Sequence, residues 1–203
     1  MAAGADREDC EDCEDWHRCF VALAPDVATR VAFAAMPVGA AVRRVPIDQL
    51  HLTLAFLGSI SEEKGSLLAA ALPSVVVALP TLIVERFEYW PSRSAPRLAV
   101  LAFTHCDALT ELEWRVRSLV AGLGLPIDDH RPFRPHVTLA RMPRDAKPIP
   151  PQLLSDSKAR PHGVDAGNAI QSSRFDTLTL YSSTLARRGA RYHALASAPV
   201  PAC

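Results

Sequence analysis

The stretch HLTLAF at residues 51–56 is repeated as HVTLAR at residues 136–141. In both copies polar and apolar residues alternate, which is typical of a β-strand that has one face in the hydrophobic core. Alternation places the histidine and the threonine of each copy on one face of the strand and the aliphatic residues on the other. The copies fall in different halves of the chain, so we expect two related lobes that each contribute one such strand.

Two histidines on facing strands are suited to acid–base chemistry at a phosphate. If the lobes face one another across a cleft, His51 and His136 can serve as base and acid in one turnover, because the ordinary imidazole pKa is about 6.5. The hydroxyls of Thr53 and Thr138 can donate hydrogen bonds to phosphate oxygens. The alternative is that these are half-buried sheet residues and the repeat is a coincidence. Zinc is disfavoured, because no carboxylate or cysteine stands at ligand spacing near either copy.

The composition is that of a folded chain without an overall charge bias. Of the 203 residues, 49% are hydrophobic, and 22 basic residues balance 22 acidic ones. A protein that coats nucleic acid through bulk charge is normally strongly basic, so any polyanion must be bound at a local site. The five cysteines are too few for a disulfide scaffold. We expect an acidic, disordered tail over residues 1–15 and a single two-lobed domain over residues 16–203.

The N-terminal segment allows a different interpretation. It offers four possible zinc ligands, namely Cys10, Cys13, His17 and Cys19. Their spacing is tighter than in common zinc fingers, which makes a structural or partner-docking zinc site the weaker alternative. The acidic N-terminus is unlike a signal peptide, so we expect a cytoplasmic protein with free thiols.

The apolar run from Leu67 to Val84 is just long enough to suggest a membrane span. Pro73 and Pro80 interrupt it, and charged residues follow at once. A helix, a turn and a buried strand explain this run better, so we expect no membrane association.

The rest of the pattern predicts an α+β fold. Strands are expected over residues 18–25, 50–57, 81–87, 98–103, 136–140, 175–181 and 191–196, and helices over 26–36, from Ser61 onward, and from Asp107 or Thr110 to Gly122. The apolar side of the first helix is expected to contain Val27, Val31, Ala32 and Ala35. A turn is expected at 90–96, and residues 142–169 are expected to be mostly loop with a short helix near 152–154. The order of strands and helices does not alternate, which argues against a doubly wound sheet.

These motifs resemble the two-histidine phosphoesterases and, among them, the RNA 2′,3′-cyclic phosphodiesterases, also called 2′-5′ RNA ligases. The resemblance rests on RCFVALAP (18–25), LHLTLAFLG (50–58), RPFRPHVTLAR (131–141) and FDTLTLYSSTLARRGARYHAL (175–195), so it spans nearly the whole chain. It implies two pseudo-symmetric lobes with antiparallel sheets around a central cleft and helices packed outside.

The resemblance also implies an activity and the residues that perform it. Members hydrolyse a cyclic phosphate at an RNA 3′ end to a 2′-phosphate, with no metal or other cofactor. By resemblance His51 is the general acid, His136 is the general base, and the phosphate is bound by Thr53, Thr138 and Arg141. The reverse reaction would join RNA ends through a 2′,5′ linkage.

Other functions remain open at this point. Within the superfamily they are a phosphodiesterase for ADP-ribose 1″,2″-cyclic phosphate and one for 2′,5′-oligonucleotides; outside catalysis, the alternative is a binder of RNA ends. We expect a monomer whose partners are RNA ends carrying a cyclic phosphate or a small cyclic nucleotide.

Overall fold

A single antiparallel sheet carries the fold in the computed structural model, which describes residues 16–38, 42–127, 132–146, 172–186 and 189–203. Its nine strands are β1 (Cys19–Pro25), β2 (Arg43–Arg44), β3 (Leu52–Gly58), β4 (Leu82–Pro91), β5 (Pro96–Phe103), β6 (His136–Arg141), β7 (Ser172–Ser173), β8 (Phe175–Ala186) and β9 (Gly189–Pro199). The described helices are α1 (Val27–Ala35), α2 (Glu62–Ala71) and α3 (Asp107–Gly122), with short 3-10 turns η1 (Ile47–Gln49) and η2 (Leu72–Val75). The α+β class is therefore confirmed.

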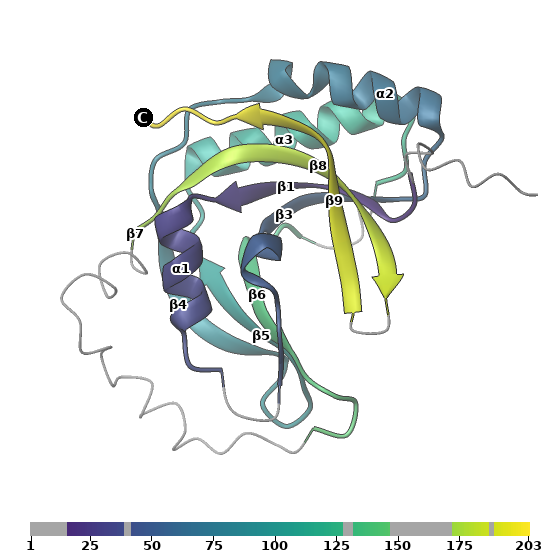
Figure 1. The fold of residues 1–203 in the computed structure, drawn as a ribbon. Helices are drawn as coiled ribbons and strands as arrows, with labels where there is room; N and C mark the ends of the chain where they lie inside the picture. The colour runs from purple at the N-terminus through teal and green to yellow at the C-terminus, as the bar shows by residue number, and fades with distance from the viewer. Residues whose placement is uncertain (1–15, 39–41, 128–131, 147–171, 187–188) are drawn as a thin grey trace, which may run out of the picture.

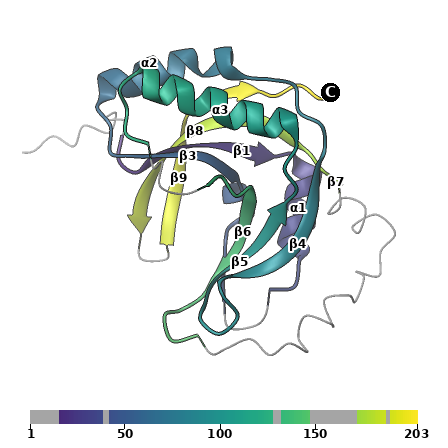
Figure 2. The same cartoon turned by 180° about the vertical axis from the view of Figure 1, so that it is seen from behind.

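The sheet has two halves that meet at the repeated motif. Its strand order is β7-β4-β5-β6-β3-β1-β8-β9, with β2 attached to β6. The central strands β6 and β3 are the two motif strands, and one residue pair joins them, Leu52 opposite Val137. Helices α2 and α3 lie together over the half that contains β1, β3 and β8, whereas α1 lies beside β4 and β5 (Figures 1 and 2). The two expected lobes are thus two halves of one continuous sheet.

Burial alternates as the sequence predicts over the first four residues of each motif, 51–54 and 136–139. Leu52 and Val137 are fully buried, and Leu54 and Leu139 are nearly so. The histidines and threonines between them are only half-buried, because they lie on the opposite face. The apolar face joins a single hydrophobic cluster that includes residues of both sheet halves.

Two of the helices begin at the capping residues that the sequence suggests. Asp26 Oδ1 accepts a hydrogen bond from the Thr29 backbone N–H at 2.7 Å, and Ser61 caps α2 in the same way. The predicted apolar side of α1 is confirmed for Ala32, which is buried, but is wrong for the other three residues: Val27 and Val31 are 76% and 56% exposed, and Ala35 is exposed too. Phe33 decides the orientation of α1, because its ring packs against Phe103 of β5 at a centroid distance of 6.2 Å.

Several strands are longer than predicted. Strand β4 continues through Trp90 to Pro91, where a turn was expected, and β8 and β9 extend toward each other as one long hairpin. The predicted tail over residues 1–15 and most of the predicted loop over 142–169, including the short helix near 152–154, lie outside the described residues. Within the described ranges, none of the helices combines the length and the hydropathy that a bilayer crossing requires.

Gly65 on α2 gives a direct test of the packing. A Cβ at this position would overlap the six-membered ring of buried Trp16, so Gly65→Ala should lower the free energy of unfolding by about 1–3 kcal/mol. Gly122 on α3 is the matched control: it has open space around it, so Gly122→Ala should leave stability unchanged or raise it by up to about 1 kcal/mol. Urea denaturation measures both, and equal effects of the two substitutions would contradict this packing.

Candidate active site

The pairing of β3 with β6 brings the two motifs into register. Because Leu52 lies opposite Val137 in an antiparallel pair, one further step in each direction along the strands places Thr53 opposite His136 and His51 opposite Thr138. All four side chains belong to the face that the buried leucines and valine leave free. Each histidine therefore lies beside the threonine of its own motif and across from the threonine of the other.

Both imidazoles are held by the same kind of hydrogen bond. Nδ1 of His51 lies 2.7 Å from the carbonyl oxygen of Gln49, and Nδ1 of His136 lies 2.7 Å from the carbonyl oxygen of Arg134. A carbonyl oxygen only accepts, so Nδ1 carries the hydrogen in both rings. This fixes the tautomer and leaves Nε2 of each ring as the nitrogen that can take or give a proton at the site.

A bulge after each threonine brings a further side chain onto the site face. In the pairing of β6 with β5, Leu139 is the extra residue, and in the pairing of β3 with β1 it is Leu54. A bulge shifts the alternation by one residue, so Arg141 and Phe56 emerge exposed instead of turning into the core. Arg141 is close enough to His51 for its charge to lower the pKa of that imidazole.

Three aromatic rings surround His51. Ring centroids lie 4.9 Å away for Phe20, 5.1 Å for Tyr192 and 6.1 Å for Tyr181. Burial among them lowers the pKa of His51 to about 4, and the positive charges of Arg141 and His136 act in the same direction. His51 is consequently neutral at pH 7 in the ligand-free protein.

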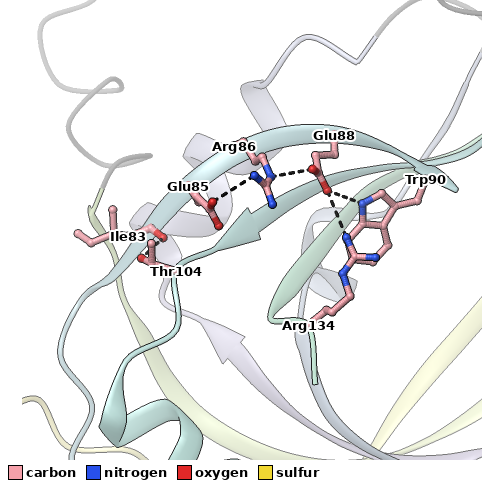
Figure 3. Close-up of polar contacts among 7 residues, drawn as sticks. All are labelled: Ile83, Glu85, Arg86, Glu88, Trp90, Thr104 and Arg134. Atoms are coloured by element: carbon pink, nitrogen blue, oxygen red, sulfur yellow. Dashed lines mark hydrogen bonds and ion pairs between the residues drawn. The ribbon is translucent and has the colours of Figure 1, made fainter. Parts of the chain in front are cut away.

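His136 is packed against a different set of side chains, which begins with Trp90. Figure 3 shows Trp90 together with Glu88 and Arg134. The Trp90 ring lies 4.5 Å from its imidazole, and the Arg134 guanidinium lies over the same indole at 4.1 Å. Glu88 accepts a hydrogen bond from Trp90 Nε1 and pairs with Arg134, so one carboxylate ties the indole and the guanidinium together. Burial, with a smaller contribution from the Arg134 charge, lowers the pKa of His136.

The structure thus brings together the sequence-predicted residues His51, Thr53, His136, Thr138 and Arg141. Sequence reasoning did not select the rings around His51, nor Trp90 and Glu88 beside His136. Trp90 was assigned to a turn, and only the length of β4 places it near the motif. The available signal would have been the glutamate followed by two aromatic residues in EYW at 88–90.

The alternative zinc ligands are only partly described. In the part of the chain that the structure describes, no three His, Cys, Asp or Glu side chains gather as potential metal ligands. Cys10 and Cys13 lie outside that part, while Cys19 is buried in β1 and His17 Nδ1 is hydrogen-bonded to Ser59 at 3.2 Å.

Known proteins are similar to this chain in sequence and in fold. The family model described as LigT like phosphoesterase matches residues 24–100. An RNA 2′,3′-cyclic phosphodiesterase of Escherichia coli strain K12 is 34% identical over 158 residues, which cover 74% of this chain and 75% of that protein. One of Thermotoga maritima is 29% identical over 153 residues, 73% of this chain and 74% of that protein.

The solved structure of Escherichia coli LigT with 3′-AMP has a TM-score of 0.64 and 30% identity, covering 91% of this chain and 98% of that one. A second crystal structure, of a phosphoesterase, has a TM-score of 0.65 and 30% identity, covering 91% of this chain and 99% of that one. The fold is therefore that of a phosphoesterase. The chain belongs to the LigT-like phosphoesterase family.

The low pKa of His51 predicts an acid-dependent loss of stability. In the unfolded chain this imidazole takes a proton near pH 6.5, whereas in the folded protein it resists protonation down to about pH 4. The stabilisation is therefore complete above pH 6.5 and is lost as the pH falls toward 4. Between pH 7 and pH 4.5 the wild type should lose about 2 kcal/mol more than His51→Gln, measured by urea denaturation. Parallel stability curves for the two proteins would contradict the burial of this ring.

Proposed function

We propose that this protein is an RNA 2′,3′-cyclic phosphodiesterase that opens the cyclic phosphate at an RNA 3′ end and leaves a 2′-phosphate. The observation that carries the proposal is the pairing of Leu52 with Val137, which sets each motif histidine across from the threonine of the other motif. Two imidazoles with fixed tautomers support acid–base chemistry on opposite sides of one phosphorus atom. The names of the relatives from Escherichia coli and Thermotoga maritima support the choice of substrate.

In the proposed mechanism His136 is the general base. Its Nε2 removes a proton from a water molecule as the water oxygen attacks phosphorus. Nε2 of His51 then gives a proton to the 3′ oxygen as the bond between phosphorus and that oxygen breaks, and the phosphate stays on the 2′ oxygen. One proton is taken up and one is released, so each turnover leaves the two histidines with exchanged protonation states that solvent restores.

Thr53, Thr138 and Arg141 stabilise charge in this mechanism. The two hydroxyls donate hydrogen bonds to the non-bridging oxygens, and the Arg141 guanidinium offsets the negative charge that grows in the pentacoordinate transition state. Their positions support these roles, because the threonines stand across from the histidines and the bulge at Leu139 turns Arg141 toward the site.

The low pKa of His51 means that its proposed role as general acid requires proton uptake by this imidazole when the substrate binds. At a pKa of about 4 the imidazole is neutral in the ligand-free protein. A bound phosphodiester anion counters the positive charges of Arg141 and His136, which raises the pKa of His51 and favours its protonated form. Substrate binding is therefore coupled to proton uptake.

This coupling predicts an acid-shifted pH profile. The ratio kcat/KM depends on the free protein, in which both histidine pKa values are below 6.5, so its maximum should lie on the acidic side of pH 6.5. The maximum of kcat should lie at a higher pH, because the bound anion raises both pKa values. Initial rates at constant ionic strength measure the two profiles, with circular dichroism confirming that the protein stays folded. A kcat/KM maximum above pH 7.5 would contradict the assignment.

The central test is hydrolysis of an oligoribonucleotide that ends in a 2′,3′-cyclic phosphate, in the presence of EDTA. His51→Ala and His136→Ala should each lower the rate by about 10²- to 10⁴-fold, since each removes a proton-transfer group. His193→Ala is the matched control, because this histidine is exposed on β9 and should leave the rate unchanged. Chromatography against standards identifies the 2′-phosphate.

Two outcomes would overturn the proposal. Loss of activity in EDTA would show that a metal carries the reaction. Absence of turnover on RNA ends would point to a cyclic nucleotide such as ADP-ribose 1″,2″-cyclic phosphate, to 2′,5′-oligonucleotides, or to binding without catalysis.

We propose further that the protein acts as a cytoplasmic monomer. All five proposed site residues come from one chain, which supports a site that is complete without a second copy. The proposed RNA substrate supports the cytoplasmic location.

A further inference from the structure

Two arginines face each other on adjacent strands without a counter-charge. Arg43 of β2 lies opposite Arg141 of β6. Like charges directly opposite in an antiparallel pair destabilise a sheet. Among the described residues, neither guanidinium has an ion pair or a side-chain hydrogen bond. A sheet that retains such a pair has a positive site that a ligand can neutralise.

Both arginines line a pocket. Its lining includes Arg43, Arg44, Gln49, Arg141, Gly189 and Tyr192. The Arg43 guanidinium lies against the α-carbon of Gly189, where a Cβ would come within 2.8 Å of the Arg43 Cζ atom. A side chain at Gly189 would therefore displace this guanidinium, so the glycine allows Arg43 its position at the pocket.

The neighbouring Arg44 is held differently. Its guanidinium donates hydrogen bonds to the carbonyl oxygens of Ala34 and Met36, at 3.0 and 2.8 Å. These carbonyls belong to the C-terminal end of α1, where a positive charge is favourable. Within the described residues, side-chain hydrogen bonds therefore hold the Arg44 guanidinium in place, whereas none holds the guanidinium of Arg43.

The pocket borders the proposed catalytic site. The backbone carbonyl oxygen of Gln49 accepts the hydrogen bond from His51 Nδ1, and the Tyr192 ring lies 5.1 Å from the His51 imidazole. Arg141 contributes to both places, since it lines the pocket and its charge acts on His51. An anion in the pocket would thus lie next to a phosphate bound between the two histidines.

We propose that Arg43 binds a second phosphate, the phosphodiester on the 5′ side of the terminal nucleotide. This inference rests on the proposed function. The reacting cyclic phosphate is a monoanion and can offset one guanidinium, that of Arg141, which leaves Arg43 to a second anion. In a nucleic-acid strand the nearest second anion is the adjacent phosphodiester, and arginine is well suited to its oxygens. The substrate is therefore an RNA strand and not an isolated cyclic nucleotide.

The test compares two dinucleotides that both end in a 2′,3′-cyclic phosphate. One has an ordinary phosphodiester between its nucleosides, and the other has an uncharged methylphosphonate there. The wild type should prefer the charged substrate about ten-fold in kcat/KM, the effect of one charged hydrogen bond at a partly exposed site. Arg43→Gln should bring this preference close to one, and Arg43→Glu should favour the uncharged substrate.

Arg44→Gln is the matched control. It removes the same charge one residue away, and it should keep the wild-type preference. Equal preference in the wild type, an unchanged preference in Arg43→Gln, or the same loss in Arg44→Gln would each overturn the proposal. Thermal melting confirms that all variants are folded.

Binding separates this proposal from the proposed function. If the wild type turns over neither substrate, calorimetry with dinucleotides that end in a 2′-phosphate, with and without the internal charge, still tests Arg43. Salt should weaken binding of the charged ligand more steeply in the wild type than in Arg43→Gln. The slope of log K against log salt concentration should differ by about 0.7, the value for one phosphate contact. Identical slopes would overturn the subsite even if hydrolysis of RNA ends is observed.

Discussion

A single antiparallel residue pair, Leu52 with Val137, sets the geometry of the whole site. Both side chains are fully buried, so the pair is held by the hydrophobic core and not by contacts within the site. A slip of one residue in either strand would turn its leucine or valine outward and its histidine into the core. The burial of apolar side chains therefore determines which histidine lies across from which threonine.

The two motifs share their frame but differ in what surrounds it. In each motif the histidine donates a hydrogen bond to the backbone carbonyl two residues before it, and a bulge follows the threonine. The bulge presents Phe56 on one strand and Arg141 on the other. Rings and the Arg141 charge act on His51, whereas Trp90 and the Glu88–Arg134 pair act on His136. The different surroundings of two similar motifs support the opposite roles that we propose for the two imidazoles.

The local sequence pattern correctly predicts the features that depend only on neighbouring residues. Alternation in the motifs gave the core face, and Asp26 and Ser61 marked helix starts. The local pattern fails where a residue distant in sequence determines which side chain is buried. Which side of α1 is buried depends on the contact between Phe33 and Phe103. Simple alternation would place Arg141 on the core face of its strand. The bulge that reverses this is seen only in the pairing of β6 with β5. The place of Trp90 beside His136 likewise depends on β4 and β5 pairing beyond the expected turn.

The strand order also constrains how the chain can be made. Strand β1 pairs with β3 on one side and with β8 on the other, and β4, β5, α3 and β6 are all synthesised in between. The half of the sheet around His51 therefore lacks its outer hairpin until β8 and β9 leave the ribosome, although its first two strands emerge early. The half around His136 can pair β4, β5 and β6 before then. Nascent chains that stop before β8 would carry an open strand edge on β1, which is where we would look for chaperone binding during translation.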